Sequence, residues 1–201
     1  MSIILLLLRL PILVVHILVG LFTILFFPKE PKNFKNSHYR IMMLWMNILS
    51  SILGIKIDIR GIPDQSANLF VSNHVTYLDI IIINKLLPVN FIAKEEISSW
   101  PVIGRLASKT GTLFIKRGDN VESSKMIYEM EERFKLQNKI VFFPEGKIGN
   151  GKRVRKFHYK LFKSIENKEL YIQPIAIRYP RGYPINNNYS EIISDKSLKG
   201  E

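Results

Sequence analysis

A histidine and an aspartate five residues apart are the first residues in this chain that could do chemistry. His74 and Asp79 lie between the apolar run 69–71, typical of a short buried strand, and an apolar helix expected at 78–87. A loop that turns from strand to helix can bring Asp79 back beside His74. A carboxylate that accepts a hydrogen bond from one ring nitrogen fixes the tautomer and makes the other nitrogen a better proton acceptor. The pair is therefore a candidate general base. The alternative is an aspartate that caps the helix and a histidine whose ring bonds to backbone.

Short apolar runs alternate with helical stretches from residue 56 onward. The expected strands cover residues 56–60, 68–72, 90–93, 112–116, 139–143 and 170–178. The expected helices cover residues 78–87, 101–109, 121–136 and 159–166. The strands are apolar throughout, so each is expected to be buried on both faces. Strand and helix alternation of this kind predicts an α/β fold, with a mostly parallel sheet flanked by helices.

In a sheet of this kind, ligands bind beyond the carboxyl ends of the strands. Those ends are expected to bring one base, several cations and one carboxylate to the same rim, namely Asn73, His74, Lys94, Lys116, Arg117, Glu145 and Gly146. The planar guanidinium of Arg117 suits phosphate oxygens. The carboxylate of Glu145 stands in a tight turn, where it can accept hydrogen bonds from substrate hydroxyls or pair with a rim cation. The alternatives are a surface arginine at a strand end and an ordinary turn.

The first 54 residues are expected to hold the protein at a membrane. Residues 3–27 are nearly continuously apolar, and a helix of about 25 residues reaches about 37 Å, enough for a hydrocarbon core of about 30 Å. A second apolar helix is expected at 38–53, so the chain is predicted to carry an N-terminal two-helix membrane anchor, either spanning the bilayer or dipping into one leaflet. Lysines follow at 29, 32 and 35, which predicts that the catalytic domain lies on the cytoplasmic side, at the inner membrane in a bacterium.

Composition limits the partners. The 201 residues hold 29 Lys+Arg against 17 Asp+Glu, a net charge of +12, which fits an anionic lipid surface, an acidic carrier protein, a phosphorylated substrate or nucleic acid. The basic run 147–160 contains no acidic residue and is either a solvated face or a contact for lipid headgroups. It has few aromatic residues, and the membrane segment argues against nucleic acid. Absence of cysteine excludes disulfides and thiolate nucleophiles. The expected organisation is an anchor at 1–54, an α/β domain at 55–185 and a polar tail at 186–201 that is either frayed or disordered.

Four motifs in order resemble the lysophosphatidic acid acyltransferase (1-acylglycerol-3-phosphate O-acyltransferase) family. Asn73-His74 with Asp79 is similar to its His-x4-Asp motif, and Gly111-x-x-Phe114-Ile115-x-Arg117 to its second. Phe143-Pro144-Glu145-Gly146 is similar to the third, and Ile172-Gln173-Pro174-Ile175-Ala176-Ile177 to the fourth. Order and spacing agree over about residues 55–180. The two N-terminal helices are also similar to family members.

The resemblance implies that an acyl chain moves from an acyl carrier protein or coenzyme A thioester to the free hydroxyl of a lysolipid, most simply 1-acylglycerol-3-phosphate. His74, oriented by Asp79, would act as general base. Arg117 and Lys94 would hold the acceptor's phosphate, while Asn73, Glu145 and Gly146 complete the acceptor site. No metal or other cofactor is expected, because the thioester is a co-substrate.

Two alternatives stay open at this point. The acceptor could be a lyso-ornithine lipid or another lysolipid. The protein could also be a catalytically inactive membrane-surface binding protein, because Lys147 stands where the family usually has Thr or Ser and the chain stops soon after the fourth motif.

Overall fold

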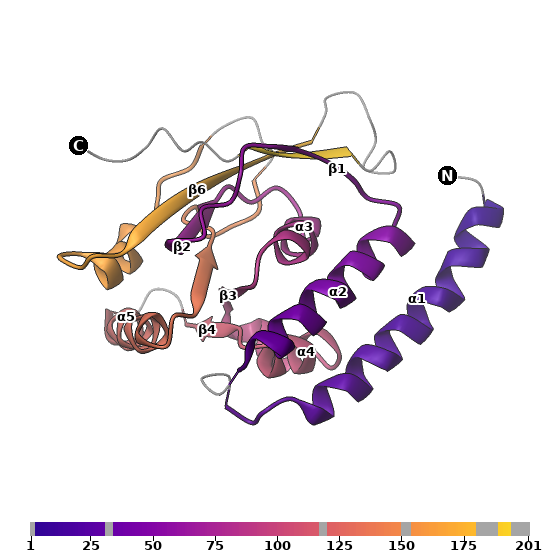
Figure 1. The fold of residues 1–201 in the computed structure, drawn as a ribbon, viewed down its shortest axis with the longest axis horizontal. Coiled ribbons are helices and arrows are strands. Elements are labelled where there is room, and N and C mark those ends of the chain that lie inside the picture. Colours follow the sequence, from indigo (N-terminus) through magenta and orange to yellow (C-terminus); the bar gives the residue numbers. More distant parts are fainter. Residues whose placement is uncertain (1–2, 31–33, 117–119, 150–153, 180–188, 194–201) are drawn as a thin grey trace.

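A computed structural model describes residues 3–30, 34–116, 120–149, 154–179 and 189–193 (Figure 1). In chain order the elements are α1 (Ile3–Thr23), η1 (Ile24–Phe26), α2 (Asn36–Ile52), β1 (Lys56–Arg60), β2 (Ala67–Ser72), α3 (Leu78–Leu86), β3 (Val89–Lys94), η3 (Glu95–Ser99), α4 (Ile103–Lys109), β4 (Leu113–Ile115), α5 (Asn120–Lys135), β5 (Lys139–Phe142), η4 (Tyr159–Ile165), β6 (Tyr171–Arg178) and β7 (Tyr189–Ile193). Each strand expected between residues 56 and 178 is present, as are the α-helices expected at 78–87, 101–109 and 121–136, with ends shifted by a few residues at most.

The strands of the described chain form one sheet in the order β1-β7-β6-β2-β5-β3-β4. The run β6-β2-β5-β3-β4 is parallel throughout, whereas β7 is antiparallel to β6 and parallel to β1. The predicted α/β fold with a mostly parallel sheet is therefore confirmed. Strand β2, which ends just before His74, has β6 on one side and β5 on the other. This order brings three chain segments together at the carboxyl end of β2.

Helices cover both faces of the central strands, which explains why those strands are apolar throughout. Leu69 and Phe70 are consecutive on β2 and both fully buried, because successive side chains of a strand point to opposite faces. Phe70 belongs to the cluster that includes Ile83 of α3, and Leu69 to the cluster that includes Met130 of α5. Figure 1 shows α3 and α5 on opposite sides of these strands.

Helix α2 packs on α3 of the α/β domain, so the predicted two-helix anchor is corrected to one possible span, because α1 alone among the described helices is long and apolar enough to cross a membrane. The Tyr39 hydroxyl lies 2.9 Å from Oδ1 of Asn90 and 3.1 Å from Oδ1 of Asn138, which tethers the helix to the beginnings of β3 and β5. Near its other end, the Ser50 hydroxyl accepts from Lys85 of α3 at 2.9 Å. The apolar residues of α2 could not show by themselves whether the helix packs against protein or lies in lipid. A helix face that packs against α3 has the same composition as one that contacts lipid.

Helix α1 keeps the features of a membrane segment. Within the described residues, one stretch, Leu7–Phe26, is long and apolar enough to cross a membrane, and most of its surface is exposed. It docks on α2 through the His16 ring, which stacks on the Trp45 indole at 4.6 Å. Gly20 allows this approach, since a Cβ atom there would lie 2.7 Å from Nε1 of Trp45. The helix is consistent with membrane association, and the cytoplasmic placement of the domain stays a prediction.

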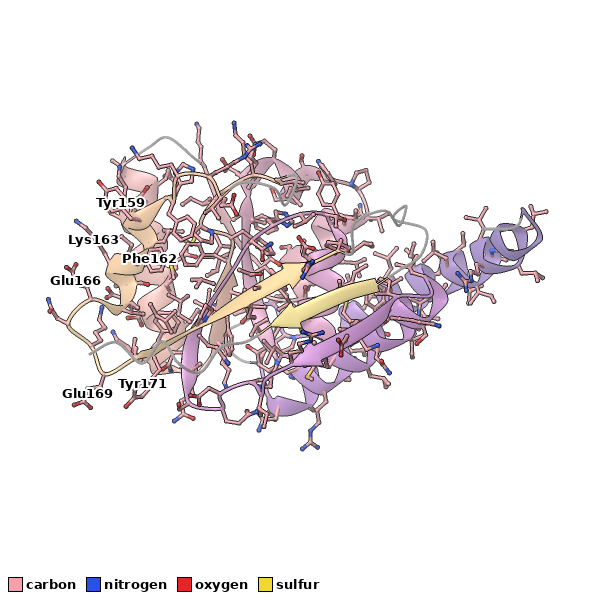
Figure 2. The ribbon with its side chains drawn as sticks, turned by 90° about the horizontal axis from the view of Figure 1, so that it is seen from above. Tyr159, Phe162, Lys163, Glu166, Glu169 and Tyr171 are labelled. Atoms are coloured by element: carbon pink, nitrogen blue, oxygen red, sulfur yellow. The ribbon has the colours of Figure 1, made fainter. Side chains whose placement is uncertain are left out.

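Two C-terminal elements differ from expectation. The helix expected at 159–166 is the 3₁₀ helix η4, which packs Phe162 against Phe142 of β5 at 5.2 Å and carries Tyr159 and Lys163 on its outer side (Figure 2). The tail expected from residue 186 contains strand β7, which the sequence analysis did not predict. It fills the space between β1 and β6, whose backbone groups would otherwise lack a partner. Residues 186–188 and 194–201 of that tail lie outside the described residues.

Gly104 tests how α4 is held against η3. A Cβ atom at Gly104 would lie 2.3 Å from the backbone oxygen of Ser98 and 2.6 Å from that of Ile97, which cannot rotate away. We expect Gly104→Ala to lower the free energy of unfolding by about 1–3 kcal/mol, as overpacking usually does. Urea unfolding of the detergent-solubilised chain measures the change, with Ser108→Ala, an exposed position of the same helix, as the control. Equal midpoints for the two variants would contradict this packing.

Candidate functional site

The loop after β2 brings His74 and Asp79 into direct contact. Nδ1 of His74 lies 2.8 Å from Oδ2 of Asp79. An ionised carboxylate can only accept, so Nδ1 carries the hydrogen and Nε2 of the neutral ring has a free electron pair. The Asp79 carboxylate is fully buried, while the His74 side chain keeps 13% of its surface exposed. The contact between the imidazole and the carboxylate is the one expected from the sequence, and the role of His74 as a general base stays a prediction.

The same carboxylate also shapes the loop. Its Oδ2 accepts from the backbone N–H groups of Val75 at 2.6 Å and Thr76 at 3.0 Å. The Thr76 hydroxyl in turn accepts from the N–H of Leu78, the first residue of α3. Asp79 therefore satisfies backbone donors of the loop, but it lies in the first turn of α3 and does not cap the helix, and the His74 ring bonds to the carboxylate rather than to backbone. A buried carboxylate is usually tolerated because several donors form hydrogen bonds to it.

Phe143 holds the His74 ring from the neighbouring strand. It follows β5 directly, and its ring stacks on the imidazole with centroids 4.0 Å apart and planes 11° apart. The backbone oxygen of His74 accepts from Gly149 at 2.7 Å, which ties the loop after β5 to the loop after β2. Stacking against one ring face and hydrogen bonding at Nδ1 leave the imidazole little freedom to rotate.

Asn73 connects β2 to β6. Its side-chain Nδ2 donates to the carbonyl of Ile177 at 2.8 Å, and its Oδ1 accepts from the N–H of the same residue at 2.7 Å. The amide thus continues the strand pairing beyond the end of β2. In the structure, Asn73 fixes the start of the loop that carries His74 to the end of β6. A contact of Asn73 with substrate stays a prediction.

The turn Phe143-Pro144-Glu145-Gly146 lies beside the dyad. Gly146 has a φ of 69°, which favours glycine, and its N–H donates to the carbonyl of Phe143. The Glu145 side chain is buried, and its Oε2 accepts from the backbone N–H of Arg155 at 3.0 Å. Glu145 therefore anchors the exposed basic segment 154–160 beside the turn. Binding of an acceptor by Glu145 and Gly146 remains a prediction.

Lys94, one of the cations proposed to hold phosphate, lies further along the rim. It ends β3, the second strand from β2, and β4 is the third. With about 4.8 Å per strand step, the end of β3 is about 10 Å and the end of β4 about 14 Å from the end of β2. Arg117 itself lies outside the described residues. Glu145, which follows β5, and Lys94, at the end of β3, thus lie in that order along the rim from the dyad toward β4.

Tyr179 is a site residue that the sequence analysis missed. It stands just beyond β6, and its hydroxyl donates to Oδ1 of Asp79 at 2.7 Å. Burial, the negative charge of Asp79 and the hydrogen bond to it all raise the pKa of this phenol. The sequence contained a signal for it, because Tyr179 directly follows a strand, as the other candidate residues do. The search for side chains at strand ends was not extended to the end of β6.

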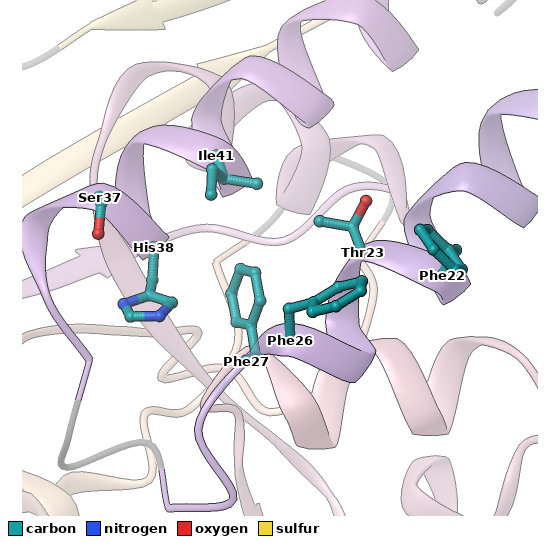
Figure 3. A pocket seen from close by; sticks show the side chains of 7 residues that line it. All are labelled: Phe22, Thr23, Phe26, Phe27, Ser37, His38 and Ile41. Carbon is teal, nitrogen blue, oxygen red and sulfur yellow. The ribbon is translucent and has the colours of Figure 1, made fainter.

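An apolar pocket of about 290 Å³ lies between the end of α1 and the beginning of α2 (Figure 3). Phe22, Phe26, Phe27 and Ile41 supply most of its lining. This end of α2 contacts the beginnings of β3 and β5, whereas His74 follows the end of β2. The pocket therefore lies near the beginnings of the strands, whereas the dyad lies beyond their carboxyl ends, so the pocket takes no part in the site.

Comparison with known proteins identifies the family of this chain. The family model described as "Acyltransferase" matches residues 56–178. The chain is 34% identical over 142 residues to a lyso-ornithine lipid O-acyltransferase from Pseudomonas aeruginosa, covering 71% of this chain and 55% of that protein. It is 36% identical over 136 residues to the protein of that name from Rhodobacter capsulatus, covering 66% and 49%. A 1-acyl-sn-glycerol-3-phosphate acyltransferase from Neisseria meningitidis is 30% identical over 141 residues, covering 69% and 55%.

The fold has a counterpart among solved structures. The crystal structure of the 1-acyl-sn-glycerophosphate (LPA) acyltransferase from Thermotoga maritima superposes with a TM-score of 0.60 at 19% identity, covering 78% of this chain and 67% of that one. The chain spans about half the length of the curated relatives that it matches. On the family match and the sequence identities, this chain belongs to the acyltransferase family.

Proposed function

We propose that the protein is a membrane-associated O-acyltransferase that transfers a fatty acyl chain from a thioester to the free hydroxyl of a lysolipid. The observation that supports it most directly is the 2.8 Å contact between Nδ1 of His74 and Oδ2 of Asp79 at the carboxyl end of β2. Family membership supplies the class of reaction, and the apolar α1 fits a lipid substrate. The thioester donor is an acyl carrier protein or coenzyme A derivative.

The proposed reaction needs one base and no covalent enzyme intermediate. Nε2 of His74 takes the proton from the acceptor hydroxyl while that oxygen attacks the thioester carbonyl. The tetrahedral intermediate then expels the thiolate, which receives the proton back from the imidazolium. The products are an ester and a free thiol. Asp79 stabilises the imidazolium between the two proton transfers, and general-base catalysis of this kind contributes roughly 10²–10⁴-fold.

The remaining assignments concern the acceptor. We assign Lys94, at the end of β3, and Arg117, which follows β4 in the sequence, to its phosphate, and Glu145 with Gly146 to its glycerol part. Asn73 would act by supporting the loop that carries the base.

A specific observation favours a second acceptor. The two relatives at 34% and 36% identity are both named lyso-ornithine lipid O-acyltransferases, whereas the glycerol-phosphate relative from N. meningitidis is at 30%. A lyso-ornithine lipid also presents a free hydroxyl to the base, but its headgroup carries an ammonium and a carboxylate in place of phosphate.

A panel of acceptors separates the two candidates. We expect membranes containing this protein to transfer a radiolabelled acyl chain to one acceptor at least tenfold faster than to the other. A headgroup with mismatched charges should raise the activation free energy by about 1.4 kcal/mol or more, which corresponds to a tenfold slower rate. The panel contains lysophosphatidate, lyso-ornithine lipid and lysophosphatidylcholine, and thin-layer chromatography identifies the products. A folded sample that binds liposomes yet transfers to none of them would favour the inactive binding protein instead.

A further inference from the structure

Asp79 uses its two oxygens differently. Oδ2 faces the loop and accepts from His74, Val75 and Thr76, all within five residues of it along the chain. Oδ1 accepts from Tyr179, which is 100 residues away. The local contacts can form as soon as the loop folds. The distant one requires that β6 lie beside β2, so it connects the base to the opposite end of the domain sequence.

We propose that Tyr179 is a positioning residue for the His74–Asp79 base, and that its hydroxyl holds the Asp79 carboxylate in the orientation that directs Oδ2 toward Nδ1. This inference rests on the proposed function for its kinetic consequences, but its structural consequence can be measured without turnover.

Two features make the phenol suitable for this task. Burial and the adjacent carboxylate raise its pKa, so the hydroxyl stays protonated and remains a donor throughout the range in which an enzyme works. Its position is held as well, because Asn73 pairs with Ile177 two residues before it. Without the phenol, a fully buried carboxylate oxygen would lack its 2.7 Å donor, and only the three donors at Oδ2 would oppose rotation about the Cβ–Cγ bond.

The donor also moderates the charge that His74 experiences. A hydrogen bond to Oδ1 draws negative charge away from Oδ2, so the carboxylate attracts an imidazolium less strongly. Removing the hydroxyl leaves more charge facing the ring, and the protonated ring is then favoured. Loss of Tyr179 should therefore stabilise the protonated imidazole relative to the neutral ring that acts as base.

Tyr179→Phe is the test, because it removes only the hydroxyl. We expect kcat to fall about tenfold with little change in KM for the acceptor, as loss of one charge-assisted hydrogen bond at the base would give. The acid limb of the pH–rate profile should move to higher pH. Tyr171→Phe is the matched control, since Tyr171 begins the same strand and is 58% exposed (Figure 2). It should behave as wild type.

A second measurement keeps the inference independent of activity. Histidine ring NMR on the ¹⁵N-labelled full chain in detergent follows the titration of His74, assigned by its absence in His74→Gln. The midpoint should be higher in Tyr179→Phe than in wild type or Tyr171→Phe. An unchanged midpoint, or a loss of stability and rate without any change of pH profile, would overturn the positioning role. If wild type transfers to no acceptor but the midpoint still moves, the proposed function fails and the role of Tyr179 stands.

Discussion

Replacing His74 by alanine should reduce acyl transfer by roughly 10²–10⁴-fold, because it removes the group that takes the proton from the acceptor hydroxyl. The exposed α1 helix is untouched by the change, so the fraction of protein bound to membranes should equal that of wild type. Initial rates on isolated membranes, together with sedimentation of the protein with those membranes, measure both quantities.

The control for this variant is His158→Ala. His158 is exposed, and its backbone N–H donates a hydrogen bond to the carbonyl of Pro144. Its side chain can therefore be removed without disturbing the turn. Its rate should stay within a factor of about two of wild type, because surface substitutions away from such a site change little. Turnover near the wild-type rate in His74→Ala would end the proposed mechanism.

Replacing Asp79 by asparagine should have the second largest effect on the rate. The amide oxygen can still accept from the His74 ring and from the loop, with the amide nitrogen toward the Tyr179 oxygen. It carries no negative charge, however, and cannot stabilise the imidazolium that forms when the acceptor is deprotonated. We expect a loss of roughly 10²–10³-fold, within the range for general-base catalysis. We also expect the free energy of unfolding to fall by about 2–3 kcal/mol, since hydrogen bonds to a buried charge are weakened.

The sign of its pH effect separates Asp79 from Tyr179. Without the carboxylate charge the protonated ring is less stable, so the acid limb of the residual activity should move to lower pH. The limb of Tyr179→Phe should move to higher pH. Asp58→Asn, at an exposed position of β1, is the control and should change neither rate nor limb. Limbs that move in the same direction in Asp79→Asn and Tyr179→Phe would contradict the charge argument for this base.

Local contacts explain why the sequence revealed the dyad. Asp79 meets His74 and two backbone N–H groups within five residues, so the loop and its spacing are sufficient to predict the pair. The strands were equally visible, because burial on both faces makes the central strands apolar throughout.

Sheet order was not visible, and it decided the rest of the site. The return of β5 between β2 and β3 stacks Phe143 on His74, and the pairing of β6 with β2 brings Tyr179 to Asp79 and Ile177 to Asn73. These partners are 69, 100 and 104 residues apart. Oδ1 of Asn73 and Oε2 of Glu145 each accept from a backbone N–H group, contacts that the sequence did not reveal.

The sequence by itself determined the α/β alternation, the position of the dyad and the apolar nature of both N-terminal helices. Tertiary structure alone decided that α2 packs on α3 while α1 stays exposed, which residues surround the base, and where β7 inserts. The physical reason is that periodicity and loop spacing record only whether a residue is buried and what lies nearby in the chain. The identity of a distant partner depends on which strands become neighbours.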